Sequence, residues 1–196
     1  MKAYYEARAR EYDDWWLGRG RFAQRDRPGW DDELADLRRT IETLPPTRTL
    51  DVACGTGFLT RHLRGEVVGL DQSRTMLDVA AEQAPRVRFV QGEGTLLPFD
   101  DGSFNRVFTS HFYGHLEENE RERFLQEARR VARELVIVDA SRAHSSVAEE
   151  YQERILNDGS RWEVYKRFFS GVSLAEELGG GHVLHEGLWF VVVASP

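Results

Sequence analysis

The chain has 196 residues, of which 41% are hydrophobic and 30% are charged. This length and composition are typical of one globular domain with a sizeable core. The formal net charge of -7 disfavours attraction to the phosphates of nucleic acid or to an anionic membrane face. No apolar stretch approaches the length of a membrane-spanning helix, and the single cysteine, Cys54, can form no disulfide within the chain. We therefore expect a cytoplasmic protein, a monomer or homodimer, whose partner is a small molecule and not a nucleic acid.

The N-terminal 27 residues are rich in aromatic and charged side chains without a clear period, and we interpret residues 1–27 as a cap. The next segment is periodic. Trp30, Leu34, Leu37 and Ile41 recur at steps of four, three and four, which predicts a helix over residues 28–44. Two prolines then end this helix.

Alternating apolar and helical patterns follow. The patterns predict strands over residues 49–53, 67–70, 87–90, 106–109 and 135–139, and helices over 58–64, 73–84 and 118–133. Such alternation is typical of βαβ units, so we expect an α/β fold of the Rossmann-like kind with a mostly parallel sheet and helices on both faces.

The C-terminal third departs from this alternation. Residues 140–170 contain a charged stretch over 149–155, which we predict to be helical, and a cluster of aromatic residues, so we interpret them as an insertion on the substrate side. A short helix near 174–178 precedes two predicted strands, 182–185 and 188–194, whose tight connection makes them antiparallel. We expect one domain over residues 1–196, with a cofactor-binding core at 28–139 and a final helix and strand pair at 171–196.

A glycine-rich turn follows the first predicted strand. In the run LDVACGTG, Gly55 and Gly57 allow backbone N–H groups to approach a ligand. A nicotinamide-binding fingerprint needs a third glycine where this chain has Thr60. Asp51, at the end of the strand, would repel a pyrophosphate but can attract an ammonium group, directly or through water.

A second acidic residue, Asp71, ends the second predicted strand twenty positions after Asp51. This is about the separation of the ribose-binding acid in nucleotide folds. Gln72 supplies a polar contact, Ser73 can cap the next helix, and Met76 is placed either against a purine face or in the core.

Four segments in this order, LDVACGTG, VVGLDQS, GEGTLLPFDDGSFN and RVFTSHFYGHL, resemble the motifs of class I S-adenosylmethionine-dependent methyltransferases. The resemblance is to the small-molecule group related to ubiquinone and menaquinone methyltransferases, methyltransferase type 11. It covers residues 49–139 and continues weakly through KRFF and LAEELGG.

The resemblance implies a seven-stranded sheet whose last strand is antiparallel, and a methyl transfer that turns S-adenosylmethionine into S-adenosylhomocysteine. It places Asp51 and the loop at the methionine part, Asp71 at the ribose, and Gln72, Met76 and Glu93-Gly94 at the adenine. The family commonly has Asp-Ala where this chain has Glu93-Gly94. The full set of cofactor-binding residues that we expect is Tyr12, Asp51, Ala53, Cys54, Gly55, Gly57, Asp71, Gln72, Met76, Glu93, Gly94 and Ser110.

Two histidines, His111 and His115, follow the fourth predicted strand and face the expected methyl group. They are the candidate catalytic bases, needed only if the acceptor must lose a proton. Cys54 fits better as a small residue under the cofactor than as a nucleophile. We expect no metal, because Ala140 and Ser141 follow Asp139 where an acid pair would be needed.

The acceptor stays open at this stage between oxygen, nitrogen and carbon atoms. Arg8, Arg10, Arg142 and Arg161 allow an acceptor with a carboxylate or phosphate. Two other functions also remain: an S-adenosylmethionine-binding protein or natural-product enzyme that does not methylate, and, less favoured, an NAD(P)-dependent oxidoreductase.

Overall fold

The computed structural model describes residues 2–196, and its central feature is a seven-stranded sheet with the strand order β3-β2-β1-β4-β5-β9-β8. The strands are β1 (Thr49–Val52), β2 (Val67–Asp71), β3 (Arg88–Gln91), β4 (Arg106–Ser110), β5 (Glu134–Ala140), β8 (His182–Glu186) and β9 (Phe190–Ser195). The last strand, β9, pairs antiparallel with β5 and with β8, whereas the first five strands pair in parallel. The predicted sheet is confirmed.

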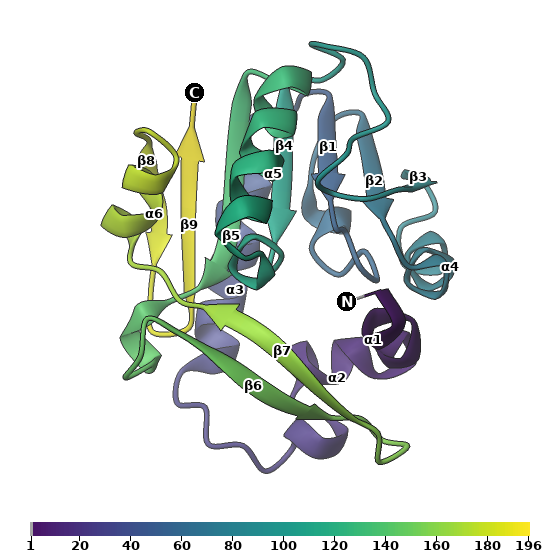
Figure 1. Ribbon diagram of the computed structural model, residues 1–196, viewed down its shortest axis with the longest axis vertical. Coiled ribbons are helices and arrows are strands. Elements are labelled where there is room, and N and C mark those ends of the chain that lie inside the picture. Colours follow the sequence, from purple (N-terminus) through teal and green to yellow (C-terminus); the bar gives the residue numbers. More distant parts are fainter. Residues whose placement is uncertain (1) are drawn as a thin grey trace.

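Helices cover both faces of the sheet. Helix α3 (Trp30–Thr43) lies behind the sheet in Figure 1, and α5 (Glu118–Val131) lies in front with α6 (Gly171–Glu177) beside it. Helix α4 (Arg74–Gln83) connects β2 to β3. Residues 135–138 of β5 are all apolar because they contribute to both sides: Val136 and Val138 pack toward α3, and Leu135 and Ile137 pack toward α5.

The N-terminal segment is more ordered than its irregular sequence indicates. It forms α1 (Lys2–Arg8), the 3-10 turns η1 (Ala9–Glu11) and η2 (Gly20–Phe22), and α2 (Tyr12–Leu17). Trp16 is buried, and its ring stacks on Phe58 and Phe190 at centroid distances of 4.8 and 5.8 Å. The sequence shows no clear period here because two helices of one or two turns are too short to produce one.

The predicted helix over 58–64 is also wrong. This segment contains only the 3-10 turn η3 (Thr60–His62), and the chain returns to β2 at Val67. The Thr60 hydroxyl donates a hydrogen bond to Asp51 Oδ2 at 2.6 Å, which holds the start of the segment against β1. Few residues remain for a regular helix between these two fixed points.

Residues 149–155, predicted as a charged helix, form the strand β6 (Glu149–Ile155). It pairs antiparallel with β7 (Arg161–Arg167) in a separate hairpin. Side chains of a strand alternate between its two faces, and the charges of β6 fall on both: Glu149 and Glu153 on one face, Glu150 and Arg154 on the other. Glu150, Gln152 and Arg154 lie on one face of the hairpin, together with Lys166 from β7.

The hairpin β6–β7 and the helices α1 and α2 lie together across the carboxyl ends of the parallel strands (Figure 1). Tyr4 of α1 packs against Trp162 with ring centroids 5.9 Å apart, and the Glu11 carboxylate accepts a hydrogen bond from the Asn157 backbone N–H at 2.8 Å. Segments from opposite ends of the sequence thus cover one edge of the sheet, where ligands bind in open α/β folds.

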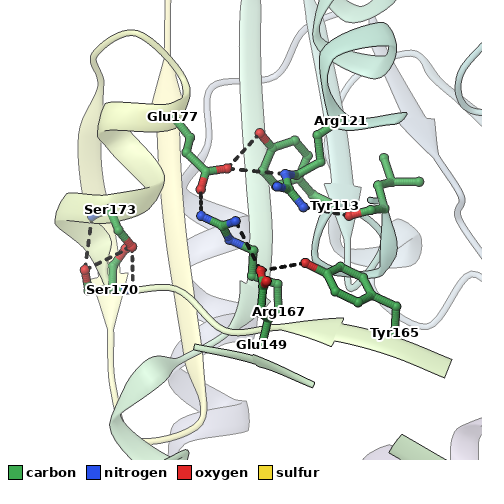
Figure 2. Close-up of polar contacts among 9 residues, drawn as sticks. Tyr113, Arg121, Glu149, Tyr165, Arg167, Ser170, Ser173 and Glu177 are labelled. Carbon is green, nitrogen blue, oxygen red and sulfur yellow. Dashed lines mark hydrogen bonds and ion pairs between the residues drawn. The ribbon is translucent and has the colours of Figure 1, made fainter. Parts of the chain in front are cut away.

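A polar network fastens the base of the hairpin to the body of the protein (Figure 2). Arg167 of β7 pairs with Glu177 of α6 and lies 3.4 Å from Glu149 of β6. Glu177 also accepts a hydrogen bond from the Tyr113 hydroxyl at 3.2 Å, and Glu149 accepts one from Tyr165 at 2.8 Å. These residues occupy the face of the hairpin opposite to Lys166.

Glu33 of α3 connects the helix to the turn between β8 and β9. Its carboxylate accepts hydrogen bonds from the backbone N–H groups of Trp189 and Phe190 at 2.9 and 2.7 Å. We predict that Glu33→Ala lowers the free energy of unfolding in urea by about 2–4 kcal/mol, because two N–H groups lose a charged acceptor. Asp32→Ala, an exposed change on the same helix, should cost less than about 1 kcal/mol. Equal effects of the two changes would contradict this role of Glu33.

Candidate active site

A cavity of about 250 Å³, here called the glycine-loop cavity, opens at the carboxyl ends of β1, β2 and β4. The structure brings nine of the predicted cofactor-binding residues and both predicted histidines to its wall. These are Tyr12, Ala53, Gly55, Asp71, Gln72, Met76, Glu93, Gly94, Ser110, His111 and His115. Sequence analysis did not identify Tyr5, Thr95 and Phe112, which also line the cavity.

Asp71 is almost fully buried at the edge of this cavity. Its Oδ2 accepts a hydrogen bond from Gly55 N at 2.9 Å, and its Oδ1 accepts one from Ser73 N at 2.8 Å. Burial raises the pKa of this carboxyl, and the two backbone N–H groups oppose that rise. Each carboxylate oxygen retains a lone pair, so the group can still accept two hydroxyl donors.

Asp51 lies beside the glycine-loop cavity, not in its wall. It faces a small cavity of about 20 Å³ lined also by Ala53, Cys54 and Ser110, which is room for about one water molecule. In the described part of the chain, Asp51 Oδ1 and Ser110 Oγ are buried without a hydrogen-bond partner. Burial raises the pKa of Asp51 to about 7. These unpartnered atoms fit a ligand that brings an ammonium group and an ordered water.

Two loop glycines have packing roles. Gly57 has a φ of +76° and lines neither cavity. A Cβ atom there would lie 3.3 Å from the Ala80 Cβ, so this glycine lets the loop approach α4. At Gly94, a Cβ would lie 2.6 Å from the Phe112 ring, which explains the departure from the family's alanine at this position.

Among residues 2–196, Ala53 and His111 are the non-glycine residues with positive φ, at 57° and 51°. They follow β1 and β4 and line the glycine-loop cavity from neighbouring strands. Side chains other than glycine adopt this conformation at a cost, and such residues concentrate at functional sites.

The two histidines lie where the glycine-loop cavity meets a second one, and they line both, as does Tyr12. The His111 ring packs edge-on against Trp15 and Trp16 at 5.0 and 5.2 Å. His115 Nδ1 lies 2.7 Å from the Tyr165 carbonyl oxygen and must donate to it, which leaves Nε2 as an acceptor. Burial lowers the pKa of both imidazoles well below the usual value, so both are neutral at pH 7.

The second cavity, here called the basic cavity, has a volume of about 390 Å³. The cationic side chains in its wall come from the N-terminal segment and the hairpin and are Arg8, Arg25, Arg27, Arg154 and Lys166. The wall also contains two acidic residues, Asp26 and Glu150, and five aromatic residues, Tyr12, Trp15, Trp30, Phe168 and Trp189. In the part of the chain that the structure describes, none of the four arginines has a carboxylate within 4.0 Å. Cationic side chains thus outnumber acidic ones in the cavity wall by five to two, in a chain whose net charge is -7.

Lys166 is the buried member of this cationic group. Its Nζ lies 2.6 Å from Asp139 Oδ1 at the end of β5. Burial lowers the pKa of Lys166, and the adjacent Asp139 carboxylate opposes that decrease. Asp139 also accepts hydrogen bonds from the backbone N–H groups of Gly114 and Ala140, each at 2.7 Å.

Of the arginines singled out from the sequence, only Arg8 lines the basic cavity. Arg10 is exposed, Arg142 donates to the Ser145 and Ser146 carbonyls, and Arg161 pairs with Glu153 at 2.8 Å. Among residues 2–196, no group of three or more His, Cys, Asp or Glu side chains could hold a metal ion, and no helix is long and apolar enough to cross a membrane.

Proteins similar to this chain are methyltransferases. A family model described as a methyltransferase domain matches residues 49–135. Demethylmenaquinone methyltransferase from Thermotoga maritima is 35% identical over 107 residues, which cover 52% of this chain and 44% of that protein. An uncharacterized methyltransferase from Alkaliphilus oremlandii is 28% identical over 69% of this chain and 63% of its own length.

The solved structure of a DhpI-SAM-HEP complex superposes with a TM-score of 0.77 at 27% identity, covering 99% of this chain and 95% of that one. A DhpI-SAH complex gives a TM-score of 0.73 at 27% identity, with 98% and 92% covered. Residues 49–135 match a methyltransferase domain, and the chain as a whole has the fold of the class I S-adenosylmethionine-dependent methyltransferases. The cofactor is S-adenosylmethionine, as the sequence motifs predicted, and the acidic residues and unpartnered polar atoms around the glycine loop fit it.

The extent of the similarity differs between the two kinds of relative. The methyltransferase chain spans less than half the length of the Thermotoga relative but nearly all of DhpI. The matched family model ends before the hairpin β6–β7, so the acceptor side of the site is matched by DhpI and not by the family model.

Asp71 provides the first test of the cofactor site. We predict that Asp71→Ala weakens binding of S-adenosylhomocysteine by about 2–4 kcal/mol, roughly thirty-fold to a thousand-fold, because two charge-assisted hydrogen bonds are lost. Isothermal titration calorimetry measures this. The matched control is Asp78→Ala, an exposed change on α4 that should leave the affinity unchanged. Wild-type affinity in Asp71→Ala would remove this residue from the site.

The raised pKa of Asp51 predicts a pH dependence. Below pH 7 the free protein holds a proton on Asp51, and that proton must leave before the carboxylate attracts an ammonium group. The affinity for S-adenosylhomocysteine should therefore fall as pH decreases below about 7, by up to about tenfold per pH unit. In Asp51→Asn, binding should be weaker and its pH profile flatter between pH 5.5 and 7.5. A profile identical to that of the wild type would show that Asp51 does not sense the ligand.

Proposed function

We propose that this methyltransferase transfers a methyl group to a small acceptor that carries an anionic group and binds in the basic cavity. The observation that carries the proposal is the set of four arginines without carboxylate partners in a cavity that shares His111 and His115 with the glycine-loop cavity. An anion is the ligand that neutralises such a group of charges. The similarity to DhpI, solved with SAM and HEP, extends over the segments that line this cavity.

In this proposal the cofactor-binding residues have separate roles. Asp71 accepts hydrogen bonds from the ribose hydroxyls, and Asp51 attracts the methionine ammonium through a water in the small cavity. Gln72, Met76 and the Glu93-Gly94 backbone contact the adenine. Tyr12, Ala53, Cys54, Gly55 and Ser110 close the space around the methionine part, and Gly57 lets the loop approach α4. These placements rest on the lining of the two cavities and on the hydrogen bonds of the two carboxylates.

The proposed chemistry needs little beyond positioning. When bound, S-adenosylmethionine would supply an electrophilic methyl group to the acceptor oxygen and would leave as S-adenosylhomocysteine. Arg154 and Lys166 hold the acceptor anion, and the aromatic side chains around it exclude water. An anionic oxygen has no proton to lose, so proximity and orientation provide the acceleration. Neither a metal ion nor a general base is required.

A second candidate function, transfer to a hydroxyl or phenol oxygen, is favoured by one observation. His115 is neutral, its Nδ1 is committed to the Tyr165 carbonyl, and its Nε2 is left as a hydrogen-bond acceptor. Such an imidazole can take a proton from an acceptor. His111, which also lines both cavities, would then orient the acceptor from the neighbouring strand.

The proposal extends to partners and location. The acidic net charge supports a small-molecule acceptor over a nucleic acid, and we place the enzyme in the cytoplasm as a monomer or homodimer.

Arg154 tests the anionic acceptor. With methyl-labelled S-adenosylmethionine and a panel of carboxylates, phosphate monoesters, phenols and amines, we expect labelled product from the anions. Arg154→Met should lower kcat/KM for them by about ten-fold to a hundred-fold, because one charged hydrogen-bond donor is lost. Arg161→Met, on the same hairpin but paired with Glu153, is the matched control and should retain wild-type turnover. Methylation of neutral acceptors alone would overturn the proposal.

A variant of His115 tests whether methyl transfer proceeds without a general base. With an anionic acceptor, His115→Gln should keep kcat within about tenfold of wild type and leave the pH profile of kcat unchanged, because no proton is removed. A decrease of about 10²–10⁴-fold together with loss of the acid limb would instead establish His115 as the general base of a hydroxyl acceptor. Calorimetry with S-adenosylhomocysteine on the same variant reports whether the cofactor site is intact.

A further inference from the structure

A third cavity lies next to the basic cavity. This outer cavity has a volume of about 230 Å³ and is formed by α1, the segment around η2 and the end of β6. Arg8, Arg25 and Arg154 line both cavities, so the two spaces adjoin at these residues. The remaining residues of the outer cavity are Tyr4, Glu11, Arg21, Phe22, Glu153, Ile155 and Leu156.

The arginines of the outer cavity are held by aromatic and polar contacts that do not neutralise them. Arg8 donates to the Tyr4 hydroxyl at 2.7 Å and lies over the Tyr12 ring at 4.7 Å. Arg25 lies over the Phe22 ring, also at 4.7 Å. Among the described residues, no carboxylate lies within 4.0 Å of Arg8, Arg21, Arg25 or Arg154. Their positive charge is available to a ligand.

The two acidic residues of the outer cavity already have partners. Glu11 accepts a hydrogen bond from Asn157 N at 2.8 Å, and Glu153 pairs with Arg161 at 2.8 Å. The cavity therefore carries an excess of positive charge. Burial of Arg154 also lowers its pKa, which indicates a cation that lacks a compensating anion.

The floor of the outer cavity is apolar. Tyr4 and Leu156 are almost fully buried there and pack with Val164 in a small hydrophobic cluster. Phe22 and Ile155 are half-buried beside them. A ligand that fits this surface combines an anionic group with a hydrocarbon segment, since apolar surface and unpaired guanidinium groups lie side by side.

We propose that the acceptor is an elongated dianion, with one anionic group in the basic cavity and a second, joined by an apolar spacer, in the outer cavity against Arg21. This inference rests on the proposed function and narrows its substrate class. The arginines between the cavities contact both ends of such a molecule, and the spacer lies over Phe22 and Ile155. An acceptor with a single anionic group would leave Arg21 and the apolar floor unused.

Straight-chain carboxylates test the inference. We would measure, by calorimetry on the protein saturated with S-adenosylhomocysteine, the affinities of glutarate, adipate and suberate against those of pentanoate, hexanoate and octanoate. At the best length, the dicarboxylate should bind at least about tenfold more tightly than the monocarboxylate of the same length, because it gains a charged contact. Arg21→Met should remove most of this difference and leave monocarboxylate binding unchanged.

A second variant and a control separate the possible causes. Ile155→Glu places a carboxylate in the outer cavity and should weaken dicarboxylate binding selectively. Arg19→Met changes an exposed arginine that lines none of these cavities and should have no effect. Equal affinities for the two series, or a dicarboxylate preference that survives both Arg21→Met and Ile155→Glu, would overturn the inference and leave the anionic acceptor intact. Failure of every carboxylate to bind, with turnover insensitive to Arg154→Met, would instead overturn the proposed function.

Discussion

The buried ion pair between Lys166 and Asp139 is the interaction on which the acceptor side of the site depends. It joins the base of the hairpin to the end of a central strand, and Asp139 simultaneously fixes the backbone of Gly114, between the two histidines. A buried pair of this kind contributes little net stability, because desolvation of both charges offsets their attraction. Removing one partner is costly, however, since the other charge is left buried. The pair therefore fixes the position of the hairpin more than it stabilises the fold.

On the cofactor side of the site, the hydrogen bonds of the two acidic residues join groups that lie close together in the sequence. Asp51, the glycine turn and Asp71 lie within twenty residues, and their hydrogen bonds connect neighbours: Gly55 to Asp71, and Thr60 to Asp51. Thr60, which argued against a nicotinamide fingerprint, thus has a definite role as a hydrogen-bond donor to the first acid. The alternation of βα units predicted a mostly parallel sheet, and the resemblance to the methyltransferase family supplied seven strands and the set that includes nine wall residues of the glycine-loop cavity.

The basic cavity could not be predicted in the same way. Its charges come from α1, from the segment before α3 and from the hairpin, and Arg8 and Arg154 come together only when the two ends of the chain fold over the sheet. Residues 149–155 gave no local signal of a strand, because their charges lie on both of its faces and such a strand shows no apolar alternation. Nothing in the sequence alone indicates the pairing of Lys166 with Asp139, and therefore which face of the hairpin points inward.

The concentration of arginines in one cavity has a kinetic consequence for a chain with an acidic total charge. The remaining surface must carry even more negative charge than the chain as a whole, so an anion at long range meets a repulsive field before it reaches the arginines. Salt shortens the range of that field to about 8–10 Å at moderate ionic strength, whereas contacts inside the cavity are screened far less. Moderate salt should therefore raise the association rate of an anionic acceptor. In enzymes whose surface charge is opposite to that of the substrate, salt lowers this rate instead. The acidic surface therefore slows the association of anions, and small ions that screen its charge remove this effect.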